Sequence, residues 1–139
     1  MSDHKQPAIL FVDEPEQELQ YLTHKFSIAG HNEAYFTVGV GTAGDVKAVA
    51  LAFGGAGSLV AGLTEGVSKM ATLALRHGVP LQAVIAELKG MYFEPQGAVT
   101  NRQQRGIRSE DVLPVIPIAR SVLDYVARWL EVTFFDAKA

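Results

Sequence analysis

The chain has 139 residues, 48% of them hydrophobic, which is enough for one packed domain without disulfides or a structural metal. Its net charge of -3 and pI near 5.8 argue against nucleic acid or an anionic membrane as a partner, because such surfaces cluster Lys and Arg. The absence of cysteine excludes disulfides, thiolate metal sites, cysteine nucleophiles and redox pairs. The apolar run at 8–12 is too short for a signal sequence or a membrane span, so we expect a cytoplasmic protein.

The first twenty residues differ in character from the rest of the chain. Four acidic residues between positions 13 and 18 are interrupted by Pro15, and no long amphipathic period is present. We therefore predict a partly flexible N-terminal arm at 1–20 and a single domain at 21–139.

Three strands are expected next. Apolar and polar residues alternate over 23–28 and 34–40, with aromatic and β-branched side chains typical of half-buried strands and a turn at 30–32 between them. The composition of 41–45 indicates a loop, and 46–53 is a third strand candidate. The pattern predicts an antiparallel arrangement of these segments.

Three helices should follow the strands. Ser58 is the predicted N-cap of the first helix, and Gly78 should end it. Pro80 favours the start of a second helix at 81–89, and the last helix should run from about 118 to 135. The apolar positions of the first helix are Leu59, Leu63, Val67, Met70, Leu73 and Ala74.

A stretch rich in Arg, Gln and Pro at 99–117 separates the second and third helices and indicates a mobile or partner-dependent loop. The fold class predicted from this order is α+β, with a small antiparallel sheet of three to four strands packed against about three helices. In the last helix, Trp129 should face the core, while Asp124 and Arg128 can pair on a more exposed face.

Five segments then stand out in order: THKFSIAGH at 23–31 with Tyr35 and TVG at 37–39; GSL at 57–59 with GL at 62–63; LALRHGVPL at 73–81; YFEPQG at 92–97; and SVLDYVARWL at 121–130. Together they resemble the domain that follows the catalytic barrel in adenosylcobalamin-dependent, class II ribonucleotide reductases. The family motif positions carried by this chain are His24, Lys25, His31, Glu94, Pro95, Asp124, Tyr125, Arg128 and Trp129.

The resemblance implies the reduction of ribonucleotides to deoxyribonucleotides, through a thiyl radical generated with adenosylcobalamin in a separate barrel domain. That chemistry needs a radical-bearing cysteine and a reducing thiol pair, and this chain has neither. We therefore expect no catalytic residue, no metal and no cofactor in this chain, with adenosylcobalamin confined to a catalytic partner.

One candidate for an anion or nucleotide site is the turn formed by Gly54, Gly55, Gly57 and Ser58, because a helix N-terminus favours phosphate. It lacks the Lys-Ser or Lys-Thr ending of a P-loop, the related family usually has a lysine where Gly55 stands, and a close-packed turn is the favoured interpretation. A second candidate is the arginine cluster, which could bind phosphate or an acidic partner or be solvated. It consists of Arg102, Arg105 and Arg108.

The remaining polar motif residues favour structural roles. His24 and His31 have no ligand cluster at metal-binding spacing, and Glu94 has no second carboxylate or His at a useful spacing. We interpret the histidines as structural or solvated and Glu94 as a loop anchor.

The leading functional hypothesis is a non-catalytic accessory, assembly or regulatory domain that contacts a catalytic ribonucleotide reductase chain or domain. It covers both a split reductase and a stand-alone relative. A second hypothesis is a small nucleotide-binding regulator that uses the glycine turn and the arginines. A third is a self-assembling structural protein that dimerises through an exposed strand edge or the final helix.

Overall fold

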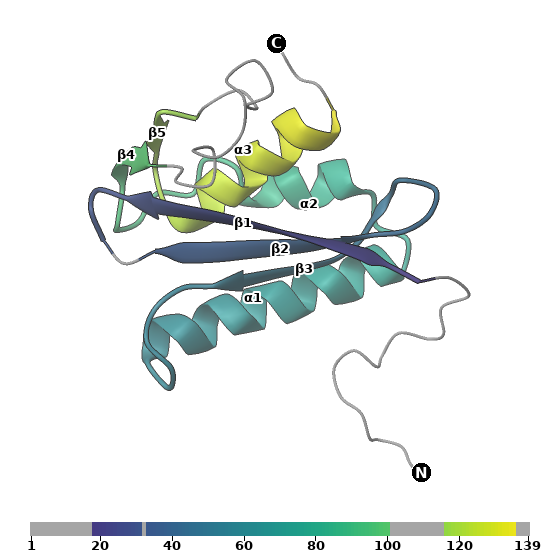
Figure 1. Cartoon of the computed structure of the whole chain (residues 1–139), viewed down its shortest axis with the longest axis horizontal. Coiled ribbons are helices and arrows are strands. Elements are labelled where there is room, and N and C mark those ends of the chain that lie inside the picture. Colours follow the sequence, from purple (N-terminus) through teal and green to yellow (C-terminus); the bar gives the residue numbers. More distant parts are fainter. Residues whose placement is uncertain (1–17, 32, 101–115, 136–139) are drawn as a thin grey trace.

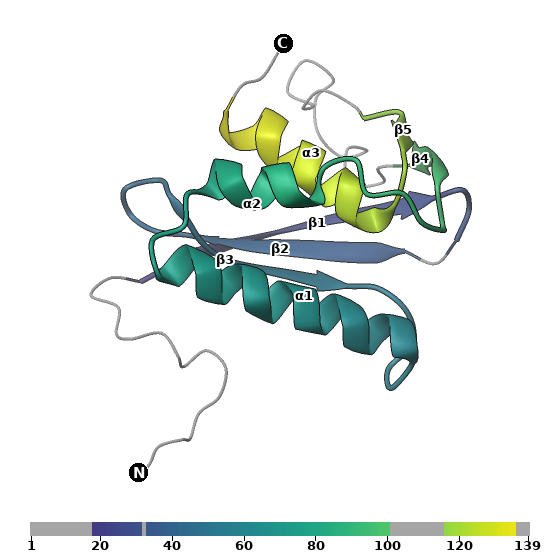
Figure 2. The same ribbon diagram turned by 180° about the vertical axis from the view of Figure 1, so that it is seen from behind.

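The computed structural model describes residues 18–31, 33–100 and 116–135, shown in Figure 1. The described residues form one sheet with α2 and α3 on one face, while α1 lies along an edge of the sheet (Figures 1 and 2). The elements in chain order are β1 (Gln20–Ile28), β2 (Ala34–Val40), β3 (Val46–Ala52), α1 (Leu59–Arg76), α2 (Leu81–Leu88), β4 (Gly97–Thr100), β5 (Ile118–Ala119) and α3 (Val122–Phe134). The predicted α+β class is therefore confirmed.

The sheet has five antiparallel strands in the order β3-β2-β1-β4-β5. The three expected strands are present, and register pairs Phe26 with Ala34 across β1 and β2. The predicted count of three to four strands was too low because β4 and β5 were missed. Val99 and Thr100 belong to β4, where they pair with β1, rather than to the predicted loop. Strands of four and two residues carry too little periodicity to be recognised without their tertiary partners.

The hydrophobic core lies between the sheet and α3. Inward side chains of β1 and β2 meet the apolar face of α3, and Ile85 adds a contribution from α2. Figure 2 shows α2 and α3 side by side over this face of the sheet. The core side chains of the two strands and α3 include Phe26, Ile28, Phe36, Val38, Val122, Tyr125, Val126, Trp129 and Leu130.

The start of α3 differs from the prediction by one turn. The helix begins at Val122 because the Ser121 hydroxyl caps it, accepting a hydrogen bond from the Asp124 amide at 3.0 Å. Ile118 and Ala119, which were expected to be helical, pair instead with β4. The N-cap residue Ser121 thus sets the start of the helix, while the residues before it join the sheet as a strand.

The orientation of α1 is the least expected feature of the fold. Its buried residues are Thr64, Ser68, Thr72 and Leu75, whereas most of its predicted apolar positions face solvent. The Ser68 hydroxyl accepts from the Leu51 amide at 2.8 Å. The Thr72 hydroxyl accepts from the Val49 amide and donates to the Val49 carbonyl, both at 3.0 Å. These hydroxyls close the open edge of β3, so this edge is not available for strand pairing.

None of the three described helices combines the length and the apolar character needed to cross a membrane. The first helix ends with His77 as its C-cap, followed by Gly78 at φ +91°, as the sequence indicated. The predicted arm, apart from 18–20, and the arginine cluster lie outside the described residues.

Candidate functional site

Several motif residues from opposite ends of the chain meet in the core. His24 is buried, and its Nε2 lies 2.8 Å from the Tyr125 hydroxyl. The His24 ring stacks on Tyr125 and on Trp129, with centroids 5.8 and 5.1 Å apart, and Phe26 stacks on Tyr125 at 4.1 Å. This cluster joins β1 to α3 and gives these motif residues a packing role.

The other motif residues of the strands and turns lie near the surface. Lys25 is 3.9 Å from Glu33, and its ammonium lies 5.9 Å from the centre of the Tyr35 ring. His31 is exposed in the turn after β1, and its backbone N–H donates a hydrogen bond to the Ile28 carbonyl oxygen. Glu94 is exposed and the adjacent Pro95 is buried. These residues are not brought together into one site.

Asp124 is the centre of a polar cluster that the sequence did not predict to be buried. Its carboxylate accepts from the Gly90 amide at 2.7 Å, the Arg120 amide at 3.0 Å and the Arg128 guanidinium at 3.0 Å. The predicted pair with Arg128 is therefore present, but its expected exposed position is wrong, because Asp124 is only 2% exposed. The backbone donors from two loops explain why the carboxylate can be buried.

The environment of Asp124 favours its charged form. Burial alone raises the pKa of this carboxyl, but the amides of Arg120 and Gly90 and the Arg128 guanidinium together hold the pKa below its ordinary value. The carboxylate is thus ionised near neutral pH and acts as a permanent acceptor. It is occupied by structural donors, which leaves it poorly placed for acid-base chemistry.

Further hydrogen bonds fix the segment after α2 against the start of α3. The Ser121 hydroxyl donates to the Met91 carbonyl at 2.7 Å, and the Phe93 amide donates to the Arg120 carbonyl at 3.2 Å. The Lys89 ammonium also donates a hydrogen bond to the Glu131 carboxylate, with 2.7 Å between Nζ and Oε1. We call residues 89–95 the clamped loop, because each half of it is bonded to the β5–α3 region.

The clamped loop presents apolar side chains to solvent. Tyr92 is 71% exposed, and Met91 and Phe93 are also exposed. Hydrogen bonds that restrain a loop reduce the entropy lost when its side chains are immobilised in a complex. Aromatic residues and Met are enriched in protein interfaces. The arrangement is therefore suited to binding a protein surface, and the sequence signal that could have located it is YFEPQG at 92–97.

The glycine turn before α1 has a structural explanation. The Ser58 hydroxyl accepts from the Ala61 amide at 3.1 Å, which occupies one of the donors that a phosphate would use. Gly54 has φ +94°, and a Cβ there would lie 3.2 Å from the Ser58 hydroxyl. Gly55, Gly57 and Ser58 are exposed, and the arginines predicted to act with them lie outside the described residues. Anion binding at this turn stays a prediction.

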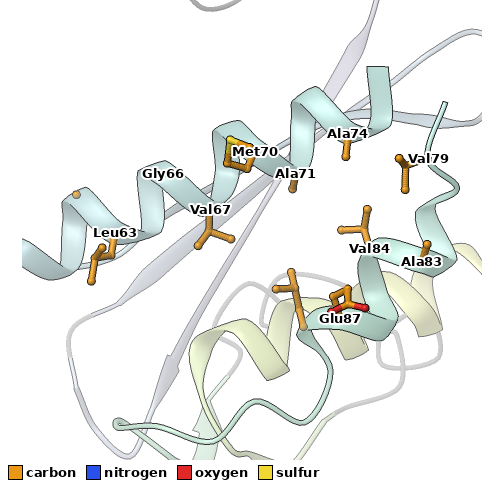
Figure 3. A pocket seen from close by; sticks show the side chains of 12 residues that line it. Leu63, Gly66, Val67, Met70, Ala71, Ala74, Val79, Ala83, Val84 and Glu87 are labelled. Carbon is orange, nitrogen blue, oxygen red and sulfur yellow. The ribbon is translucent and has the colours of Figure 1, made fainter. Parts of the chain in front are cut away.

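A groove of about 660 Å³ lies between α1 and α2. Figure 3 shows Val67 of α1 and Val84 of α2 on its two sides. The lining is almost entirely apolar, and Glu87 is the charged residue at the groove. Within the described ranges, no group of three or more His, Asp or Glu side chains could hold a metal ion.

Fold and site together define a small α+β domain in which Asp124 and Ser121 hold an exposed loop by hydrogen bonds to its backbone. The chain belongs to the TSCPD domain family, whose model matches residues 5–134. It is similar to proteins named vitamin B12-dependent ribonucleotide reductase. The relative from Rhodopirellula baltica is 36% identical to this chain, over a region that covers 84% of this chain and 10% of the relative's length. The relative from Streptantibioticus cattleyicolor is 27% identical, over 81% of this chain and 17% of the relative's length.

A third relative of the same name, from Streptomyces coelicolor, is 27% identical over 81% of this chain and 10% of its own length. The chain thus spans only about a tenth to a sixth of these relatives. No solved structure matches the chain.

Proposed function

We propose that this chain is a non-catalytic accessory module that binds the catalytic part of a vitamin B12-dependent ribonucleotide reductase. The proposal is supported by the relatives of that name, in which the matching region is a small part of the length. It is also supported by the lack of cysteine, since the radical chemistry implied by the resemblance requires thiols. Adenosylcobalamin and substrate are bound by the catalytic chain or domain in this proposal.

The observation that carries the proposal is the clamped loop. Asp124 and Ser121 use buried hydrogen-bonding groups to hold Gly90 and Met91 by their backbones, although burying such groups is costly unless each is paired. The result is a fixed display of Tyr92 and its neighbours on the surface. We propose that these side chains contact the catalytic chain.

The test is co-purification with the catalytic ribonucleotide reductase polypeptide of the same source, followed by turnover with and without this chain. Tyr92→Ser should weaken the complex at least tenfold, since a central aromatic contact is worth about 2 kcal/mol or more. Tyr21→Ser is the matched control, because Tyr21 is 62% exposed on β1, away from the loop.

A complex with altered turnover, lost on Tyr92→Ser and retained in the control, is the expected result. A complex that tolerates Tyr92→Ser would remove the clamped loop from the proposal. Absence of both complex and turnover effect would overturn the accessory role itself.

A further inference from the structure

The groove between α1 and α2 is an apolar surface that the described residues leave open (Figure 3). On its α1 wall, Met70 is 64% exposed. Gly62 and Gly66 line the same wall, and a Cβ added at either position would meet no atom within 4 Å. The backbone of α1 is therefore accessible to a segment that approaches along the groove. Contiguous exposed apolar surface of this kind indicates a binding site.

The same chain contains an apolar segment outside the described residues. This segment is AILFV at 8–12, which lies between polar residues on one side and acidic residues on the other. We call it the apolar run. The TSCPD family model matches residues 5–134 and so includes the run within the domain. A segment joined to a surface by a short linker has a high effective concentration beside that surface.

The start of β1 lies at the correct end of the sheet for this segment. Gln20 at the start of β1 and Val46 at the start of β3 both pair with Val40. Helix α1 runs antiparallel to β3, as the order of its hydroxyl bonds to that strand shows. The chain therefore enters β1 at the end of the sheet where α1 ends and α2 begins (Figures 1 and 2).

The lengths also agree. Two strand spacings and one packing distance, about 20 Å in all, separate the start of β1 from the near end of the groove. The six residues from Val12 to Glu18 span up to about 20 Å when extended. The apolar run itself is about 17 Å long as a strand, and the α1 wall from Leu63 to Ala74 is also about 17 Å long.

Charge is matched at both ends of the groove for this direction of entry. The acidic residues at 13–14 follow the run and would lie at the start of α2. Among the described residues no side chain caps α2, and its first turn has no acidic residue, although a helix N-terminus favours negative charge. Arg76 in the last turn of α1 lies at the same end. Lys5 precedes the run and would lie toward Glu87, whereas the reverse direction would bring acidic residues to Glu87.

We infer that the apolar run at 8–12 docks in the groove between α1 and α2 of its own chain, with Val12 at the end of the groove where Val79 lies. Because the groove is open, the outward backbone groups of the docked segment stay hydrated while its apolar side chains cover the two walls. The contact is a local equilibrium, so it changes the exposure of groove residues more than the stability of the fold. The inference does not depend on the proposed reductase partner.

The first test is hydroxyl-radical oxidation of Met70 in the whole chain. Replacing both Leu10→Ser and Phe11→Ser should make Met70 oxidise several-fold faster, because the run then leaves the groove. Gln17→Ser is the matched control within the same part of the chain, and Met91, which is exposed on the clamped loop, should react equally in all three proteins. Equal oxidation of Met70 in all three would overturn the inference. So would protection that increases with protein concentration, because the run would then bind another molecule.

The second test uses the absence of cysteine, which makes any introduced thiol pair unique. Val12→Cys combined with Val79→Cys should form a disulfide within one chain under mild oxidation. Val12→Cys combined with Ile118→Cys is the control, because Ile118 is exposed on β5, at the opposite edge of the sheet from β3. Mass spectrometry of the monomer measures the yield. Equal yields from the two pairs, or disulfides found only between chains, would contradict docking in the groove.

Discussion

Helices α1 and α3 use opposite chemistry to attach to the same sheet. Helix α3 buries Tyr125, Trp129 and Leu130, as an amphipathic helix normally does. Helix α1 buries Thr64, Ser68 and Thr72 against a strand edge, and it exposes most of its larger apolar side chains, with Leu75 as a buried exception. The difference arises because α3 covers a sheet face, which is apolar, whereas α1 covers a sheet edge, which consists of backbone donors and acceptors.

The strongest way to sharpen the contrast is to truncate one large apolar side chain in each helix. Trp129→Ala should lower the free energy of unfolding by about 3–5 kcal/mol, since Trp129 is buried between Phe36 and His24. Urea denaturation measures this change. The matched substitution Met70→Ala should change the stability of the monomer by less than about 0.5 kcal/mol. Equal losses would break the distinction between the two helices.

Asp124→Asn should have the next largest effect, about 2–3 kcal/mol, because an amide cannot satisfy two backbone donors and the guanidinium equally well. Hydrogen exchange should report faster opening at Gly90. Exchange unchanged from the wild type would show that Asp124 does not restrain the clamped loop.

The Asp124 carboxylate should also make the stability of the wild type depend on pH in acidic solution. Its folded-state pKa is lowered, so its stabilisation is fully present above the ordinary Asp value of about 3.9 and is lost as pH falls through the folded pKa. Chemical denaturation measures the free energy of unfolding between about pH 6 and pH 2, a range that includes the ordinary value. This free energy should fall more steeply with decreasing pH in the wild type than in Asp124→Asn. Parallel pH profiles would contradict this role.

A smaller effect is expected on the buried side of α1. Thr72→Val keeps the shape but removes the hydroxyl that bonds both backbone groups of Val49, and we expect a loss of about 1–2 kcal/mol. Thermal unfolding followed by circular dichroism measures it. A stability gain from the added methyl group would mean that α1 is held by ordinary apolar packing.

The smallest effect on folding belongs to the exposed face of α1. Leu63→Gln should alter the free energy of unfolding by less than about 0.5 kcal/mol, because the side chain is largely exposed. Urea denaturation measures this change. A loss above about 1 kcal/mol would show that Leu63 is packed within its own chain.

These two helices also show how far the sequence could go. The alternation in β1 and β2, the Ser58 cap and the core position of Trp129 follow from local patterns, and each is found as predicted. The period of α1 located its apolar stripe correctly, but a stripe does not say which surface covers it. That depended on the strand edge formed by Val49 and Leu51, which is a tertiary property.

For the same reason, only part of the candidate site could be predicted from the sequence. The spacing of Asp124 and Arg128 predicted their pair, whereas the motif at 92–97 was noted only as a resemblance and the exposure of Tyr92 and Phe93 was not predicted. Their connection is made by backbone donors at Gly90 and Arg120, whose approach to the carboxylate has no signal in local periodicity. A contact made through backbone atoms can be recognised only once the chain is folded.

Side-chain oxidation by hydroxyl radicals tests the role of the clamped loop most directly, because Met91 and Tyr92 are exposed reporters on that loop. We predict that Met91 and Tyr92 become protected when the catalytic reductase chain is added, whereas Tyr21 on β1 keeps its reactivity. Full reactivity of Tyr92 in the complex would contradict the assignment of this surface.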